Sequence, residues 1–152
     1  MKKGMLVMRQ NKISSAAIAL CMVAFFTMGS VPSVSAATPI PVSITAVFDF
    51  STFPNVSGTF TTGGALTVSG TATMNVGLLG GPTGTVAHCV VTLIASDSSG
   101  TIVIDQECQF ATSPPKGRWE IVSGTGAYAN LNANGSLTMP PNTEAMTGFI
   151  YQ

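Results

Sequence analysis

The chain has 152 residues, and its six Lys and Arg balance six Asp and Glu, so the formal net charge is zero. Four of the six basic residues lie close to the N-terminus, at Lys2, Lys3, Arg9 and Lys12. The rest of the chain has two basic residues against six acidic ones, a net charge of −4. An acidic domain lacks the positive surface that attracts phosphate backbones and anionic lipids, which excludes nucleic-acid binding and electrostatic attachment to membranes.

The N-terminal segment has the pattern of a secretion signal. Its basic residues precede an uncharged apolar run over residues 13–28, and Ala36 and Ala37 follow as small residues where a signal peptidase would cut. About 20 apolar residues are needed to span a bilayer, and this run is shorter and leads directly into a Gly/Pro/Ser segment. We predict a signal peptide over residues 1–36, a secreted or periplasmic location and no stable membrane insertion after cleavage. A membrane anchor is the alternative interpretation.

Residues 37–152 are predicted to form one all-β domain. Their length is near the commonest domain size, and Thr, Ser, Gly and Val dominate their composition, which disfavours helices. Alternating apolar positions and turn signals predict strands over residues 44–50, 59–62, 66–76, 86–95, 101–110, 119–123, 135–139 and 146–151. This pattern predicts a small antiparallel barrel of about eight strands, with a β-sandwich as the alternative.

Cys89 and Cys108 are the two cysteines that remain after cleavage. In an oxidising exported compartment an even pair is most simply a disulfide, since a redox pair favours Cys-x-x-Cys and a zinc site needs more ligands. Residues 97–100, Asp-Ser-Ser-Gly, form a turn signal between two apolar runs. A two-residue turn at Ser98-Ser99 would place the cysteines opposite each other and predicts a disulfide across the hairpin, whereas a three-residue loop would shift the register by one.

The same hairpin has an apolar and a polar face. The face expected to meet the core carries Cys89, Val91, Leu93, Ala95, Ile102 and Ile104. The opposite face carries His88, Asp105 and Glu107, with His88 expected opposite Gln109; we predict that it faces water. In the alternative interpretation, His88 and the carboxylates form a buried binding site. One histidine and two carboxylates on a flat strand face lack the convergence of a metal site, so no metal and no cofactor is predicted.

Asp49 is a further candidate binding residue, because it interrupts the first strand between Phe48 and Phe50. With both aromatic side chains inside the barrel, Asp49 would lie in water, which is the interpretation that we favour. The reverse orientation would place Asp49 in the lumen, where burial would raise its pKa and suit it to acid–base chemistry. Trp119 and Tyr128 are predicted to fill the core.

One segment carries a family resemblance. Residues 117–131, Gly-Arg-Trp-Glu-Ile-Val-Ser-Gly-Thr-Gly-Ala-Tyr-Ala-Asn-Leu, are followed by Asn-Gly-Ser-Leu at 134–137. Together they resemble the W-x-I-x-x-G-T-G-x-Y-A-x-L-x-G-x-G segment of bacterial proteins related to allene oxide cyclase and, more distantly, of plant dirigent proteins. Ala133 stands where that family usually has a glycine. The resemblance implies an allene oxide cyclase-like, and more broadly calycin-like, barrel.

The residues of this segment also predict a local structure by themselves. Gly124 and Gly126 allow the positive φ angles of a tight reversal after a strand. A helical turn over residues 127–131 would then place Tyr128 and Leu131 against the end of the barrel. The segment lacks the lysine and following helix of a nucleotide-binding loop.

Two functions from different classes remain open. The resemblance and the barrel size imply a lumen that binds a small apolar molecule, with or without steering its cyclisation by holding it in one folded shape. The alternative is a non-enzymatic secreted structural or interaction protein with a packed barrel, since few charges and many Thr and Ser suit a homo-oligomer. A cavity of roughly a few hundred Å³ with two or three polar groups would support the first function, and a packed interior would support the second.

Overall fold

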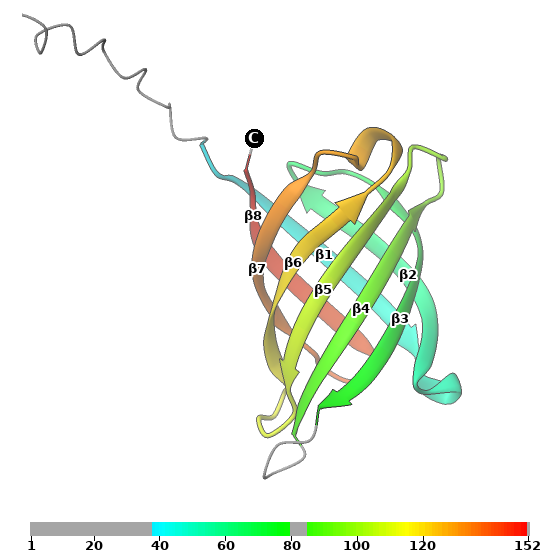
Figure 1. Ribbon diagram of the computed structural model, residues 1–152, viewed down its shortest axis with the longest axis vertical. Coiled ribbons are helices and arrows are strands. Elements are labelled where there is room, and N and C mark those ends of the chain that lie inside the picture. The colour runs from blue at the N-terminus through cyan, green and yellow to red at the C-terminus, as the bar shows by residue number, and fades with distance from the viewer. Residues whose placement is uncertain (1–37, 80–84, 152) are drawn as a thin grey trace, which may run out of the picture. The chain divides into compact units, whose positions relative to one another are not determined.

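The computed structural model describes residues 38–79 and 85–151, and these form a closed barrel of eight antiparallel strands (Figure 1). The strands are β1 (Ile40–Asp49), β2 (Asn55–Gly64), β3 (Ser69–Leu79), β4 (Val86–Ala95), β5 (Thr101–Gln109), β6 (Lys116–Gly124), β7 (Asn132–Thr138) and β8 (Thr143–Tyr151). Each strand pairs with the next, and β8 pairs with β1. The predicted barrel is therefore confirmed over the sandwich. The predicted signal peptide, residues 1–36, lies outside the described residues.

Several strands are longer than the sequence predicted. β1 begins at Ile40, because Ile40 and Pro41 already pair with β8. The pairing of β1 with β2 starts at Val42, so the missing N–H group of Pro41 does not interrupt it. β2 continues through Gly64, where a turn was expected. β8 begins before the predicted start at residue 146, and this extension brings Glu144 into the barrel wall. Between residues 38 and 79 and between 85 and 151, no helix is long and apolar enough to cross a membrane.

The lumen is filled mainly by the inward-facing side chains of all eight strands. The face of the β4–β5 hairpin that was predicted to meet the core is no more than 6% exposed at any of its six positions: Cys89, Val91, Leu93, Ala95, Ile102 and Ile104. Full burial of a Val, Leu or Ile side chain is worth about 1.5–3 kcal/mol, so this alternation stabilises the closed sheet.

Trp119 is the largest of the fully buried side chains, and Gly148 makes room for it. Trp119 on β6 pairs with Gly135 on β7, which in turn pairs with Gly148 on β8. A Cβ atom at Gly148 would lie 2.8 Å from Cζ2 of the indole. The indole Nε1 donates to the carbonyl oxygens of Ser136 at 3.0 Å and Thr147 at 3.3 Å, so its polar atom is satisfied.

The second half of the segment with the family resemblance, after β6, lies at the upper end of the barrel in Figure 1. A 3₁₀ turn, η2 (Gly126–Tyr128), follows β6, and Gly126 has a φ of +59°, as the tight reversal requires. Tyr128 is 8% exposed, and its hydroxyl lies 2.6 Å from Oγ of Ser99 in the β4–β5 loop. Leu131 packs against the core. The prediction that Tyr128 and Leu131 lie against the barrel end is therefore confirmed.

The register of the β4–β5 hairpin differs from the predicted one. The Ala95 N–H donates to the carbonyl oxygen of Gly100 at 3.1 Å, so a longer loop replaces the expected two-residue turn. Cys89 is therefore opposite Gln106, and Cys108 is opposite Ala87. The prediction that the two cysteines face each other directly is wrong.

The cysteines are instead diagonal neighbours on the inner face of the barrel. Cys89 is 1% exposed and Cys108 is fully buried. The interaction with the Cys89 thiol, together with burial, raises the pKa of the Cys108 thiol. No bond joins the two sulfur atoms in the structure, and the disulfide stays a prediction.

Candidate functional site

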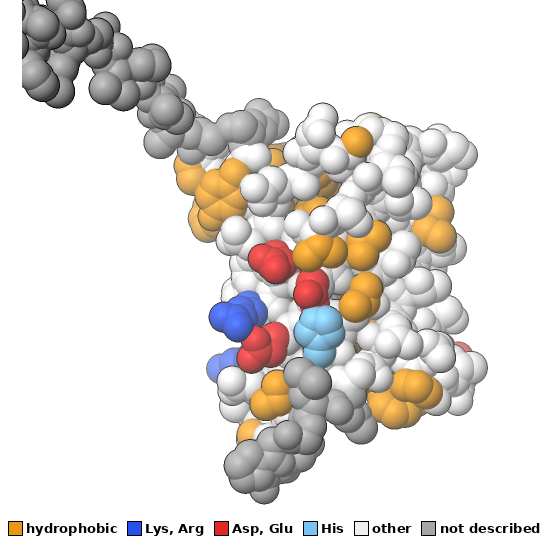
Figure 2. All heavy atoms as spheres, in the orientation of Figure 1, with side chains coloured by type: hydrophobic (Ala, Val, Ile, Leu, Met, Phe, Trp, Pro, Cys, Tyr) orange, Lys and Arg blue, Asp and Glu red, His pale blue; other side chains and the backbone are white. Residues whose placement is uncertain are grey.

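Three of the predicted site residues lie together on the outer wall of the barrel. His88 on β4 is paired with Glu107 on β5, and its Nε2 lies 2.5 Å from Oδ1 of Asp105. The expectation that His88 opposes Gln109 is wrong, because the longer loop shifts the register of the whole hairpin. Figure 2 shows that charged side chains gather on this face, whereas its surroundings are mostly uncharged.

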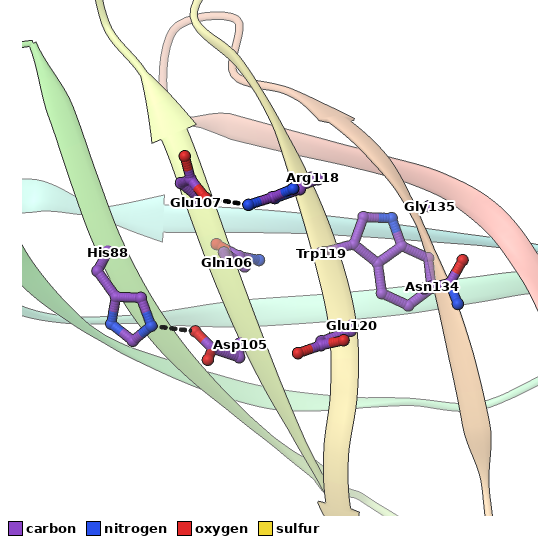
Figure 3. Close-up of a pocket in the computed structure, with 9 residues that line it drawn as sticks. All are labelled: His88, Asp105, Gln106, Glu107, Arg118, Trp119, Glu120, Asn134 and Gly135. Atoms are coloured by element: carbon purple, nitrogen blue, oxygen red, sulfur yellow. Dashed lines mark hydrogen bonds and ion pairs between the residues drawn. The ribbon is translucent and has the colours of Figure 1, made fainter.

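These residues line a polar groove of about 690 Å³ on β4, β5, β6 and β7 (Figure 3). Nη2 of Arg118 on β6 donates to Oε2 of Glu107 at 2.6 Å. Glu120 and Asn134 lie further along the groove. The charges of the groove are thus largely paired with one another across neighbouring strands.

The groove has the properties of a solvated surface. The side chains of His88 and Asp105 are 45% and 33% exposed, so water reaches part of each of them. In the part of the chain that the structure describes, no group of three His, Cys, Asp or Glu side chains could hold a metal ion. The alternative interpretation, in which His88 lies sealed in a pocket, does not agree with this geometry.

We expect His88→Ala, Asp105→Ala and Glu107→Ala each to change the free energy of unfolding by less than about 0.5 kcal/mol, as is usual for exposed positions. Urea unfolding of the three variants and the wild type would measure this. A loss of several kcal/mol for any of them would show that the outer ion pairs stabilise the barrel.

Asp49 lies at the lower end of the barrel and does not face the lumen. It ends β1 and caps a short 3₁₀ turn, η1 (Phe50–Thr52), where its Oδ1 accepts a hydrogen bond from the Ser51 N–H at 2.9 Å. This hydrogen bond lowers the pKa of the exposed Asp49 carboxyl. Phe48 faces the core, as predicted, but Phe50 is 41% exposed because the strand has already ended. The lumenal orientation of Asp49 is therefore wrong.

Two other polar residues lie inside the barrel. Gln106 on β5 is 2% exposed and Glu144 on β8 is 1% exposed. Nε2 of Gln106 donates to Oε1 of Glu144 and, at 3.4 Å, to the sulfur of Met146. Burial of an amide or a carboxyl is costly unless it is hydrogen-bonded, so each group stabilises the other in the apolar lumen.

The environment of Glu144 favours its neutral form. Burial raises the pKa of the carboxyl to about 7, although the hydrogen bond from Gln106 opposes this effect. Near pH 7 the carboxyl of Glu144 therefore changes between its neutral and its ionised form.

Two cavities lie at the end of the barrel where β1, β3 and β5 end, and Glu144 lines one of them. This end is the lower one in Figure 1. One cavity of about 240 Å³ is almost wholly apolar and is lined by Phe50, Phe53, Met74, Val76, Cys89, Phe110 and Met139. A second cavity of about 150 Å³ shares Phe50, Phe110 and Met139 with the first and reaches Glu144. The two cavities thus adjoin along a shared apolar wall, with Glu144 at one side.

The rim of these cavities exposes aromatic side chains to water. Phe50, Phe53 and Phe110 are 41%, 52% and 44% exposed, and they come from the β1–β2 and β5–β6 connections. Contiguous exposed apolar surface is a common mark of a binding site. Together the residues define a closed β-barrel with an apolar, aromatic-rimmed cavity. No family model, curated protein or solved structure matches the chain.

Proposed function

We propose that this protein is an exported barrel that binds a small apolar molecule at the lower end of its lumen. The observation that carries the proposal is the pair of adjoining cavities that share Phe50, Phe110 and Met139. The remainder of the interior is filled by large side chains such as Trp119 and Ile104. A barrel of eight strands holds either packed side chains or one small ligand, and here the lower end has space for a ligand.

The chemistry of the cavity walls favours an apolar ligand. Phenylalanine, methionine and valine side chains supply most of the lining of the larger cavity. A ligand that covers Phe50, Phe53 and Phe110 would remove apolar surface from water, which is worth about 25 cal/mol per Å². Under the same proposal, steering a cyclisation needs few polar groups, because the walls need only hold a reactive molecule in one folded shape.

Binding can be tested with a small neutral fluorescent probe, 2-acetylnaphthalene. We expect saturable binding of one probe per chain, measured by fluorescence titration of the mature protein. Val76→Trp should weaken binding at least tenfold, because Val76 is 8% exposed and lines the larger cavity. Val90→Trp is the matched control, since Val90 is 38% exposed on the outside of β4.

The comparison between the two tryptophan variants decides the result. Loss of binding in Val76→Trp alone supports the cavity. Equal binding by the wild type and both variants would place the probe on the outer surface, and no binding by the wild type would leave the packed, non-enzymatic barrel as the better account.

Export and cysteine oxidation are parts of the same proposal, and one intact-mass measurement on exported protein tests both. We expect a mature chain that begins at Ala37 or Thr38 and is two hydrogen atoms lighter than its reduced form, because Cys89 and Cys108 are diagonal neighbours on paired strands. In the chain-entropy model a loop of about 20 residues gives a stabilisation of roughly 3 kcal/mol, so the Cys89→Ala/Cys108→Ala variant should melt at a lower temperature. Two titratable thiols in the exported protein, or retention of residues 1–36, would contradict this.

A further inference from the structure

We propose that Glu144 is the polar end of the lumen site and selects apolar ligands that carry one hydrogen-bond-accepting oxygen, such as that of a ketone or an ether. This inference rests on the proposed function and specifies its ligand class. Glu144 would donate its carboxyl proton to the ligand oxygen while the rest of the ligand lies against the aromatic wall.

The hydrogen-bonding of Glu144 leaves one oxygen for a ligand. Oε1 accepts the hydrogen bond from Gln106, whereas Oε2 is buried and has no partner among residues 38–79 and 85–151. A buried polar atom without a partner costs roughly 1–3 kcal/mol, so a ligand that engages it gains affinity. Glu144 is also one of the residues that line the smaller cavity.

Among the residues that the structure describes, none supplies a positive charge that stabilises the ionised form of Glu144. Its partner on β1 is Ala46, Met139 and Pro140 line the same cavity, and Gln106 faces it from β5. The titratable groups that face it from β4 and β5 are the thiols of Cys89 and Cys108, which also interact with it electrostatically.

The nearest charged groups on these strands do not change that conclusion. Asp105 and Glu107 lie on the outer wall of β5 and are themselves acidic, and no Lys, Arg or His lines either cavity in the described part of the chain. The carboxyl is therefore a hydrogen-bond donor in its stable form, and its natural partner is a neutral acceptor. A cationic ligand would instead have to give up its own hydration in an apolar cavity.

A matched pair of probes tests the inference: 2-acetylnaphthalene, a ketone, and 2-isopropenylnaphthalene, a hydrocarbon of nearly the same shape. At pH 5.5 we expect the wild type to bind the ketone at least tenfold more tightly than the hydrocarbon. With the carboxyl pKa at about 7, ketone affinity should fall roughly thirtyfold between pH 5.5 and pH 8.5 while hydrocarbon affinity changes little.

Two variants separate hydrogen bonding from shape. Glu144→Gln keeps a neutral donor, so it should prefer the ketone at both pH values. Glu144→Leu removes the donor, so it should bind both probes equally, and its hydrocarbon binding also shows that the barrel has folded.

The outcomes distinguish this inference from the proposed function. If the wild type binds both probes equally at both pH values and Val76→Trp abolishes both, the lumen binds apolar molecules but Glu144 does not select among them. If the wild type binds neither probe in the cavity, both the inference and the proposed function are wrong.

Discussion

Glu144→Gln should have a larger free energy of unfolding than the wild type at pH 8. It should also lack the decrease in this free energy that the wild type shows as pH rises. Burial raises the folded-state pKa of Glu144 from 4.5 to about 7. The folded wild type therefore binds more protons than the unfolded chain between these values, so its free energy of unfolding falls as pH rises through this window. The expected loss is about 3 kcal/mol in total, and urea unfolding of both proteins from pH 4 to pH 8 would measure it.

The difference in the free energy of unfolding between Glu144→Gln and the wild type should appear only as the pH rises above about 4.5. Below about pH 4.5 the wild-type side chain is neutral in both states, and the two proteins should have similar stability. Glu120→Gln is the matched control, because Glu120 is an exposed carboxylate on the outer face of β6. Wild-type and Glu144→Gln curves that run parallel from pH 4 to pH 8 would show that Glu144 is solvated in the folded protein.

Trp119→Ala should reduce the free energy of unfolding by about 3–5 kcal/mol, the usual cost of removing a buried aromatic side chain. The indole is 2% exposed, and it occupies space that a side chain at Gly148 would fill. Its removal leaves an empty cavity that the backbone of a closed barrel cannot easily fill. Denaturant unfolding of the mature protein measures the change.

Trp119→Phe is the companion variant. It keeps most of the apolar volume but removes the N–H that donates to Ser136 and Thr147, so its loss of stability should be smaller than that of Trp119→Ala. A loss below about 1 kcal/mol for Trp119→Ala would contradict the view that this side chain supports the wall formed by β6, β7 and β8.

The barrel was predictable from the sequence because strand alternation is a local signal. Val91, Leu93, Ile102 and Ile104 stand at every second position of their strands, and the same positions are buried in the closed sheet. The hairpin register was not predictable, because it depends on the length of the β4–β5 loop. Several loop lengths are compatible with the turn residues of the 97–100 segment.

The inner polar pair was missed for two different reasons. Gln106 shares its strand face with Ile104 and Cys108, so extending the alternation along β5 would have placed it inside. The last predicted strand began at its first clearly apolar residue, Met146. Glu144 lies two residues earlier and was therefore not assigned to that strand. The hydrogen bond between them joins strands that are distant in sequence, and periodicity contains no information about such a contact.

The predicted outer residues show why charged side chains were a poor guide to the lumen. In a chain with few charges, the sequence predicted a candidate site at His88, Asp105 and Glu107 because their side chains can exchange protons. They lie on the outside because the other face of the same strands is more apolar. Of the acidic residues that the structure describes, Glu144 is the one that lines either of the two lower cavities, and the inner face of its strand otherwise carries Met146, Gly148 and Ile150.

The most direct test of the account is to locate a ligand in the barrel. Crystals of the mature protein equilibrated with 2-bromonaphthalene would reveal the bromine by its anomalous scattering. We predict one strong peak within the lower end of the lumen, beside Phe50, Phe110 and Met139, where the two cavities meet. Bromine found only on the outer surface, or a lower lumen filled by side chains with no bromine at all, would contradict the proposal that this barrel binds a small apolar molecule.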